Sequence, residues 1–329
     1  GGFPVTVYGH GTGGSFTGVV RSGIVRELAL GIAGDGAGGV QTAVLSFDLP
    51  QHGARRAGST VPPDQLFFNF LNPPAAAGNV LQGAADFLSL LRALPNVATA
   101  ADTLLTGQSV ALASGSGGKV AWFTHSQGST HAALMLPYLR AGEGTVAAVL
   151  SGLGGDLSQS LLHKRQPIDI ATALPLVLLD ADGNGALPGG TFHPVLALFQ
   201  TYFDRADAVN YAWRVQRERV AGSLPAHVLQ TYGLDDSYSP EETMQAFARA
   251  ADLAQALPVR RDFGRPTAAV PLSSNVSLGG QDYSIALRQY DAIDGEGHFV
   301  ATTAGVPGRA QAVRFVRQAL AAMAPVVSD

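Results

Sequence analysis

The chain has 329 residues, of which 46% are hydrophobic and 14% charged, so it can bury a large core. The length fits one large α/β domain or two smaller ones, and we first expect one domain with an insertion. The net charge is −4 without a long basic run, which excludes the electrostatic footprint of a protein that binds nucleic acid or an anionic membrane surface. The lack of cysteine excludes disulfides, thiolate metal sites and a cysteine nucleophile.

No apolar run reaches the roughly 18 residues that a membrane helix needs, so we expect no stable membrane span. The sequence begins at Gly1 without methionine and enters a strand pattern within a few residues. We therefore expect that a leader or upstream segment was removed, which favours a secreted or periplasmic protein. The sequence leaves the oligomeric state open.

Apolar runs that predict β-strands alternate along the chain with patterns that predict helices. The strand runs are continuously apolar, which is typical of strands covered on both faces in a mostly parallel sheet. The predicted strands are 3–9, 42–49, 119–126, 145–152, 226–233 and 284–293. The predicted helices are 22–33, 77–94, 129–142, 239–257 and 308–324, with Ser239 as the N-cap of the fourth. This alternation predicts a doubly wound, mostly parallel α/β sheet.

The first predicted strand leads into VYGHGTGGSF, residues 7–16, which has two incompatible interpretations. Its glycines form the G-x-G-x-x-G pattern of dinucleotide-binding folds, whereas His10-Gly11 is how many hydrolases begin an oxyanion hole. The glycine pattern is a weak signal in a chain with 40 glycines. A dinucleotide site also requires an acid about 20 residues further on, at the end of the next strand. Asp48 ends that strand but lies much farther along the chain, which disfavours the cofactor interpretation.

The third predicted strand runs through THSQG, residues 124–128, directly into a helix. This strand, sharp turn and helix form the context of a nucleophile elbow, in which Ser126 would be the nucleophile. Small residues are needed two positions before and after the serine because the turn is strained. Thr124 and Gly128 occupy those positions, so threonine departs mildly from the usual G-x-S-x-G.

A nucleophilic serine needs a histidine base and an acid that orients the base. Asp236 follows the fifth predicted strand in GLDDSYSPEE, and His298 follows the last one in DAIDGEGHFV. Asp235 is the competitor of Asp236, because adjacent loop acids point in different directions. The spacing favours Asp236, and only His298 among the eight histidines has the expected position.

With Ser126, Asp236 and His298 in this order, the sequence resembles the α/β-hydrolase superfamily, in particular its serine esterases and lipases, over nearly the whole chain. The resemblance implies an α/β-hydrolase fold and an oxyanion hole made by the backbone N–H groups of Thr12 and Gln127. It also implies that His10 is a structural residue of its loop and that no cofactor is used.

Residues 156–225 lie between two predicted core strands and exceed what a crossover connection needs. In the hydrolases that the chain resembles, a segment at this place is commonly a lid or cap over the acyl site; the alternative is a helical subdomain that only packs on the core. We expect a first core part at 1–155, a lid at 156–225 and a second core part at 226–329. Phe199 and Phe203 are candidate substrate contacts in the lid, and the aromatic segment 59–79 is a candidate second wall.

The stretch DADGNGALPGG, residues 180–190, contains Asp180, Asp182 and Asn184 and matches the first half of an EF-hand calcium loop. The twelfth position is threonine instead of glutamate, and no flanking helix pair is evident. A polar turn is therefore favoured over a calcium site.

Together these observations predict a serine carboxylester hydrolase that acts on a small-molecule or lipid-like ester with an apolar acyl group. An amidase or a thioesterase could use the same triad. A non-catalytic ligand-binding protein with a relic triad is the alternative from another class.

Overall fold

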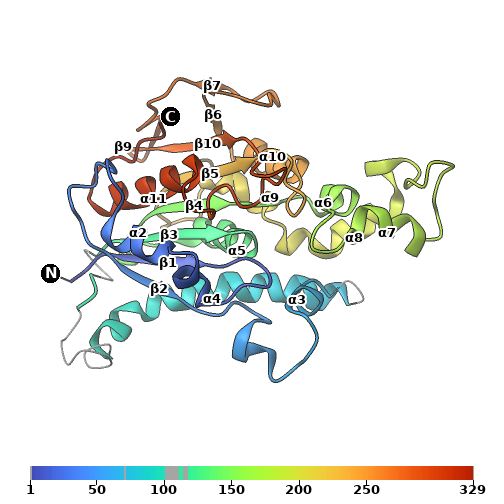
Figure 1. Ribbon diagram of the computed structural model, residues 1–329, viewed down its shortest axis with the longest axis horizontal. Helices are drawn as coiled ribbons and strands as arrows, with labels where there is room; N and C mark the ends of the chain where they lie inside the picture. The colour runs from blue at the N-terminus through green and yellow to red at the C-terminus, as the bar shows by residue number, and fades with distance from the viewer. Residues whose placement is uncertain (1, 70–71, 101–110, 114–117, 329) are drawn as a thin grey trace.

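The computed structural model describes residues 2–69, 72–100, 111–113 and 118–328, and its centre is an eight-stranded sheet (Figure 1). The strand order is β2-β1-β3-β4-β5-β10-β6-β7, and all neighbouring strands in it are parallel. The strands are β1 (Val5–Gly9), β2 (Ala43–Ser46), β3 (Val120–His125), β4 (Thr145–Ser151), β5 (His227–Gly233), β6 (Ala254–Ala256), β7 (Thr267–Ala268) and β10 (Ile285–Tyr290). A separate antiparallel hairpin consists of β8 (Val276–Leu278) and β9 (Gln281–Tyr283).

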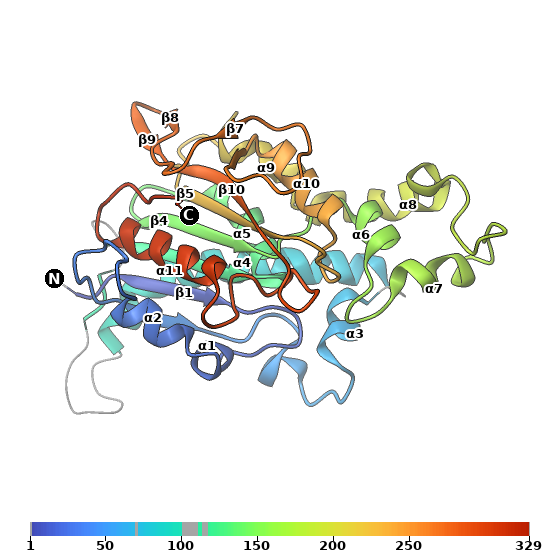
Figure 2. The ribbon, with the colours of Figure 1, turned by 45° about the horizontal axis from the view of Figure 1, so that its top comes forward.

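Helices cover both faces of the sheet (Figure 2), as the continuously apolar strands require. On one face, α4, α5, α9 and α10 pack on side chains such as Trp122 and Leu150, and on the other, α2 and α11 pack on Phe123 and Val149. The helices are α1 (Gly18–Arg21), α2 (Ile24–Leu30), α3 (Pro63–Phe68), α4 (Pro73–Ala100), α5 (Gln127–Met135), α6 (Leu157–His163), α7 (Ile170–Val177), α8 (Pro194–Phe203), α9 (Val209–Ala212), α10 (Glu241–Ala250) and α11 (Pro307–Leu320). The doubly wound parallel sheet predicted from the sequence is confirmed.

All six predicted strands are present, but the prediction of a helix over 239–257 is wrong in its second half and at its N-cap. Helix α10 ends at Ala250, and Ala254–Ala256 instead forms β6, which pairs with β10. The N-cap is Pro240 instead of Ser239. The Ser239 hydroxyl does not cap the helix and donates to the carbonyl oxygen of Gly152 at 2.7 Å. Strands β6 to β9 are too short to give a recognisable apolar pattern.

The order of the strands determines where a ligand can bind. Strand β1 lies between β2 and β3, so the chain winds in one direction from β1 to β2 and in the other from β3 onward. In open α/β sheets, ligands bind outside the carboxyl ends of the strands at such a reversal. The loop after β1 and the turn after β3 meet at this position.

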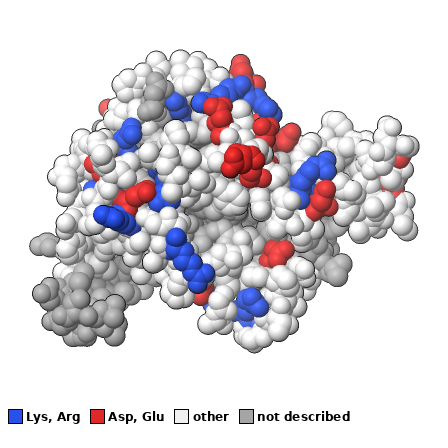
Figure 3. Space-filling view, viewed as in Figure 1, with Lys and Arg blue, Asp and Glu red and all other residues white. Residues whose placement is uncertain are grey.

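Residues 156–225 contain α6 to α9, and α7 and α8 project beyond the carboxyl ends of the strands (Figures 1 and 2). The projecting part has a small core of its own, made by Leu161, Ile170, Leu174, Leu187 and Leu196. Few charged side chains lie on its surface in the face drawn in Figure 3. Among the described residues, no helix combines the length and the apolar composition needed to cross a bilayer.

Candidate active site

Ser126 lies in a sharp turn between β3 and α5, with φ 53° and ψ −118°. Residues with side chains rarely adopt a positive φ, and the conformation costs about 1–3 kcal/mol, so the surroundings must hold it in place. The backbone N–H of Ser126 donates to the carbonyl oxygen of Ser151 at 2.7 Å, which ties the turn to the end of β4. This strained strand-to-helix turn is the geometry of a nucleophile elbow.

The neighbours of Ser126 are small where the turn approaches β1. A Cβ at Gly128 would lie 2.5 Å from the carbonyl oxygen of Gly9, so only glycine fits there. Thr124 stands where the usual motif has glycine, and its hydroxyl donates to the carbonyl oxygen of Val149 at 2.6 Å. A Cβ at Gly9 would lie 3.2 Å from Cγ2 of Thr124, so the glycine on β1 provides the room that the threonine needs.

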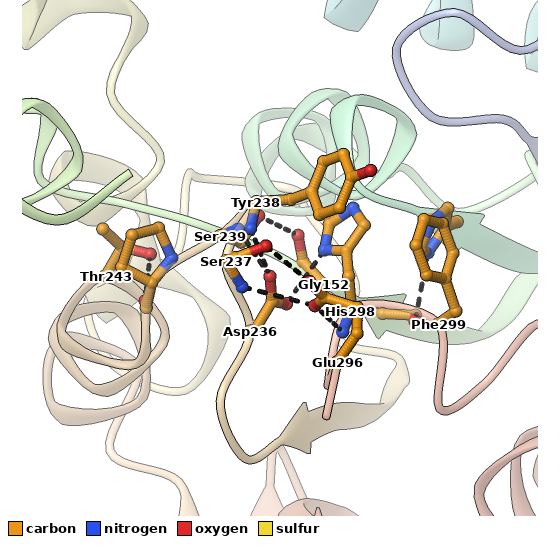
Figure 4. Close-up of polar contacts among 12 residues, drawn as sticks. Gly152, Asp236, Ser237, Tyr238, Ser239, Thr243, Glu296, His298 and Phe299 are labelled. Atoms are coloured by element: carbon orange, nitrogen blue, oxygen red, sulfur yellow. Dashed lines mark hydrogen bonds and ion pairs between the residues drawn. The ribbon is translucent and has the colours of Figure 1, made fainter. Parts of the chain in front are cut away.

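His298 and Asp236 meet at the carboxyl ends of β10 and β5 (Figure 4). The Nδ1 atom of His298 lies 2.9 Å from Oδ2 of Asp236, and both side chains are almost fully buried. The other carboxylate oxygen of Asp236 accepts the N–H groups of Tyr238 at 2.9 Å and Ser239 at 2.7 Å. The side chain of Asp235 is 65% exposed and lies 3.9 Å from Arg261, so Asp236 is the acid that contacts His298.

Three further residues hold this pair in place (Figure 4). Glu296 accepts the N–H of His298 at 2.8 Å and the hydroxyl of Ser237, and so fastens the histidine loop to the aspartate loop. The ring of Tyr238 stacks on the His298 imidazole with centroids 4.7 Å apart. Gly152 has φ +57°, and a Cβ there would lie 2.7 Å from Cε1 of His298. The imidazole is therefore packed on two sides.

Ser126 and His298 line the same cleft. Because Nδ1 of His298 is engaged by Asp236, Nε2 is the nitrogen available to the serine. Among the hydrogen bonds of the described residues, none joins Ser126 Oγ to His298. Catalytic hydrogen bonds are often long before substrate binds and shorten in the complex.

The loop after β1 lies against Ser126. A Cβ at Gly11 would lie 2.9 Å from the Cβ of Ser126, and the hydroxyl of Thr12 donates to the side-chain oxygen of Gln127 at 2.9 Å. Gln127 is the first residue of α5, so its N–H lies at the positive end of the helix dipole. In the described part of the chain, the N–H groups of Thr12 and Gln127 donate to no protein acceptor. Two amides are therefore available beside Ser126.

Four features decide the fold: a parallel sheet with a strand reversal at β1, an elbow after β3, an acid after β5 and a histidine after β10. The chain has the α/β-hydrolase fold. The resemblance noted in the sequence is confirmed at this level. The glycine-rich loop after β1 approaches the elbow serine and is not followed by the long helix of a dinucleotide-binding unit.

Several solved hydrolases of low sequence identity are similar to this α/β-hydrolase fold. The 2,6-dihydroxy-pseudo-oxynicotine hydrolase is 11% identical, with 100% of this chain and 64% of that one covered and a TM-score of 0.49. An acetyl xylan esterase from Paenibacillus sp. R4 is 16% identical, with 82% and 67% covered and a TM-score of 0.41. A thioesterase of the prodiginine pathway in Streptomyces coelicolor is 15% identical, with 96% and 85% covered and a TM-score of 0.40.

No model of a known protein family matches the sequence, and no curated protein does. At these identities and TM-scores, the assignment of the fold rests on the strand order and the elbow.

The cleft has a volume of about 690 Å³. Phe67 and Phe68 of α3 form part of its wall, so the predicted second wall contributes to it. From the insertion, residues of α6 and the end of α8 line it, including Phe203. Phe199 is not among the lining residues, because its ring packs on the small core of the insertion. Of the two phenylalanines singled out in the sequence, the structure places only Phe203 at the cleft.

Four other buried histidines surround the site, and burial lowers the pKa of each. The pKa of His10 falls to about 4 and that of His131 to about 3, while the pKa of His125 falls well below its usual value. The Nε2 atom of His10 accepts the N–H of Leu49 at 3.1 Å, and that of His52 accepts the N–H of Gly13 at 2.8 Å. His10 and His52 are therefore neutral, and their side chains hold the loops around Ser126 in place.

The stretch 180–190 forms a polar turn. The Oδ1 atom of Asp182 accepts the N–H groups of Asn184 at 2.8 Å and Ala186 at 3.0 Å, and Gly185 has φ +79°. Asp180 contacts His193 at 3.0 Å instead of turning toward Asp182. Within the described ranges, no three metal-ligating side chains lie together.

Sequence reasoning missed Lys164, Glu296 and Gly152. Glu296 precedes His298 by two residues, and a carboxylate so close to the histidine is the one local signal of a loop anchor among the three. Gly152 follows the β4 pattern, and Lys164 lies between two helices of the insertion. Neither of these two has a local signal, because each acquires its position through a distant part of the chain.

Proposed function

We propose that the chain is a serine hydrolase that cleaves carboxylic esters. The observation that carries this proposal is the buried contact of 2.9 Å between His298 and Asp236, beside a serine in a strained elbow that lines the same cleft. An elbow serine, a histidine and an acid are the parts that nucleophilic acyl transfer requires.

In the proposed reaction, Oγ of Ser126 attacks the ester carbonyl while Nε2 of His298 takes its proton. Asp236 holds Nδ1–H, fixes the tautomer and stabilises the imidazolium. The N–H groups of Thr12 and Gln127 donate to the oxyanion, and each such donor contributes about 3 kcal/mol to lowering the barrier. The proton passes to the leaving alcohol, and water activated by His298 then releases the acid from Ser126.

The cleft has an aromatic wall suited to an apolar acyl group, which favours an esterase or a lipase over a peptidase. Phe67, Phe68 and Phe203 supply that wall. An amidase or a thioesterase remains the second candidate, since all three reactions use the same groups.

The insertion at 156–225 is proposed to act as one side of the acyl site. The start of α6 and the end of α8 line the cleft, whereas α7 projects away from it. The proposed unit boundaries therefore remain 1–155 for the first core part, 156–225 for this wall and 226–329 for the second core part.

The proposal is tested with 4-nitrophenyl esters of increasing acyl length and with a fluorophosphonate that labels activated serines. We expect hydrolysis, and labelling at Ser126 that Ser126→Ala abolishes. Ser160→Ala is the matched control, because Ser160 lines the same cleft and should leave the label on Ser126. Hydrolysis by Ser126→Ala at the wild-type rate would exclude this mechanism, and a folded wild type without label or hydrolysis would favour the relic triad.

A further inference from the structure

Lys164 follows α6 and brings a positive charge from the insertion to the cleft. Its side chain is 9% exposed, and Nζ donates to the carbonyl oxygen of Tyr238. The same nitrogen lies 5.6 Å from the centroid of the Phe68 ring. Because Tyr238 and Phe68 both line the cleft, the ammonium group lies at the border between the loop of Asp236 and the aromatic wall.

No carboxylate of the described residues lies within 4.0 Å of Nζ, so this buried cation has no ion-pair partner there. The two acids whose charges favour the charged form of Lys164 are engaged elsewhere: Asp236 with His298, and Glu296 with Ser237 and the N–H of His298. Burial lowers the pKa of Lys164 to about 8. Burying an ammonium is costly unless an anion pairs with it, and only one of its three donors is used by Tyr238.

The other side chains that line the cleft do not duplicate the positive charge of Lys164. Among the described lining residues it is the only lysine or arginine. Of the lining acids, Asp207 accepts the N–H groups of Asp156 at 2.9 Å and Leu157 at 3.0 Å, and Asp156 caps α6. Asp64 on α3 is half-buried, so water and salt screen the repulsion between its charge and an anion in the cleft.

We propose that Lys164 binds a carboxylate of the substrate, so that the enzyme prefers esters carrying a free carboxylate beside their apolar part. This inference rests on the proposed ester hydrolysis and specifies its substrate class. The carboxylate supplies the missing partner, and the aromatic wall accommodates the apolar part. The pair is a charge-assisted hydrogen bond in a mostly buried site, where such bonds are strong.

The alternative is that Lys164 only fastens the insertion to the loop of Asp236. Two backbone bonds already do so: the N–H groups of Arg165 and Gln166 both donate to the carbonyl oxygen of Ser237 at 3.0 Å. A neutral donor would satisfy the Tyr238 carbonyl equally well. A fastening role therefore explains the hydrogen bond of Lys164, whereas its charge is favoured by Phe68, Asp236 and Glu296 but is paired with no carboxylate of the described residues.

The test compares two substrate pairs that differ in a carboxylate. On the acyl side, mono-4-nitrophenyl suberate is compared with 4-nitrophenyl octanoate, and on the alcohol side, 4-carboxyphenyl butanoate with its methyl ester. We expect the wild type to favour the carboxylate member of one pair in kcat/KM. Lys164→Gln should lower that preference at least tenfold, mainly through KM, and Lys164→Arg should retain most of it.

Arg165→Gln is the matched control, because it removes a neighbouring positive charge that is 60% exposed and pairs with Asp169. It should leave the preference unchanged. A wild type that favours the neutral member of both pairs would overturn the inference. It would also be overturned if Lys164→Gln lowered kcat/KM equally for the carboxylate and the neutral member of a pair.

Two further measurements separate this inference from the proposed function. If no ester is hydrolysed and Ser126 is not labelled, the proposed function fails, and calorimetric binding of suberate still tests Lys164. Suberate should then bind the wild type at least tenfold more tightly than Lys164→Gln, and equal binding would overturn the inference. If Lys164→Gln does not fold, suberate and its dimethyl ester are compared as competitive inhibitors of ester hydrolysis by the wild type. Suberate, the dianion, should inhibit more strongly, and stronger inhibition by the dimethyl ester would overturn the inference.

Discussion

Asp235 and Asp236 are neighbours in the chain but have opposite surroundings. Asp235 has φ 59°, and its side chain is 65% exposed. The side chain of Asp236 is fully buried and accepts two backbone N–H groups besides its contact with His298. Since a carboxylate held this way fixes the imidazole tautomer, the two acids should differ sharply when each is changed to the amide.

Asp236→Asn should lower kcat for an ester substrate about a thousandfold or more, because the amide favours the wrong tautomer of His298. Asp235→Asn should change kcat by less than about threefold, because an exposed ion pair contributes little. Steady-state kinetics on both variants, with melting temperatures to confirm folding, make the comparison. The reverse ranking would transfer the orienting role to Asp235.

At the scale of an element, the end of β4 shapes the site without providing a reacting group. Gly152 follows β4 with φ +57°, its carbonyl oxygen accepts the Ser239 hydroxyl, and the space where a Cβ would lie is taken by His298. Gly142, in the turn before β4, also has a positive φ of +90°, but nothing lies within 4 Å of a Cβ there. The two glycines thus share a backbone requirement and differ in what they face.

Gly152→Ala should lower kcat at least tenfold, because the methyl group displaces the His298 ring, whereas Gly142→Ala should leave kcat unchanged. Both variants should lose about 1 kcal/mol of unfolding free energy, because alanine disfavours a positive φ. Ester kinetics and urea unfolding of the pair separate the two effects. Equal activity in both variants would show that the contact between Gly152 and His298 does not matter.

At the scale of the whole molecule, the insertion has two parts with different partners. Its base meets the cleft through the end of α8, where Phe203 also packs on the main core. Its outer part has its own small core, against which Phe199 packs. The two phenylalanines therefore allow the acyl wall to be tested apart from the insertion's own stability.

In the wild type, kcat/KM should rise with acyl length, with up to about 0.8 kcal/mol for each buried methylene, until the cleft is full. Phe203→Ala should flatten this rise and affect acetate esters least, because a short acyl group does not reach the ring. Phe199→Ala should keep the wild-type dependence while lowering the melting temperature. A rise that survives Phe203→Ala would remove this residue from the acyl site.

Six strands of the sheet, most helices, the strand-turn-helix context of Ser126 and the chain order of Ser126, Asp236 and His298 could be predicted from the sequence. These features are local: continuous apolar runs and helical periodicity depend on neighbouring residues, and an elbow requires small residues close to its serine. The prediction of a helix over 239–257 is wrong where Ala254–Ala256 pairs with β10 and β7, because hydrogen bonding to two strands outweighs the helical preference of alanine.

Three other features depend on the folded chain: which of two adjacent acids faces His298, that Phe203 and not Phe199 reaches the cleft, and that Lys164 lies buried beside Tyr238. Gly9 likewise makes room for Thr124 from a strand far away in the sequence. Each of these depends on which side chains approach across the fold. The chemical types along a chain do not determine such distances, because they are set by the packing of elements that are remote in sequence.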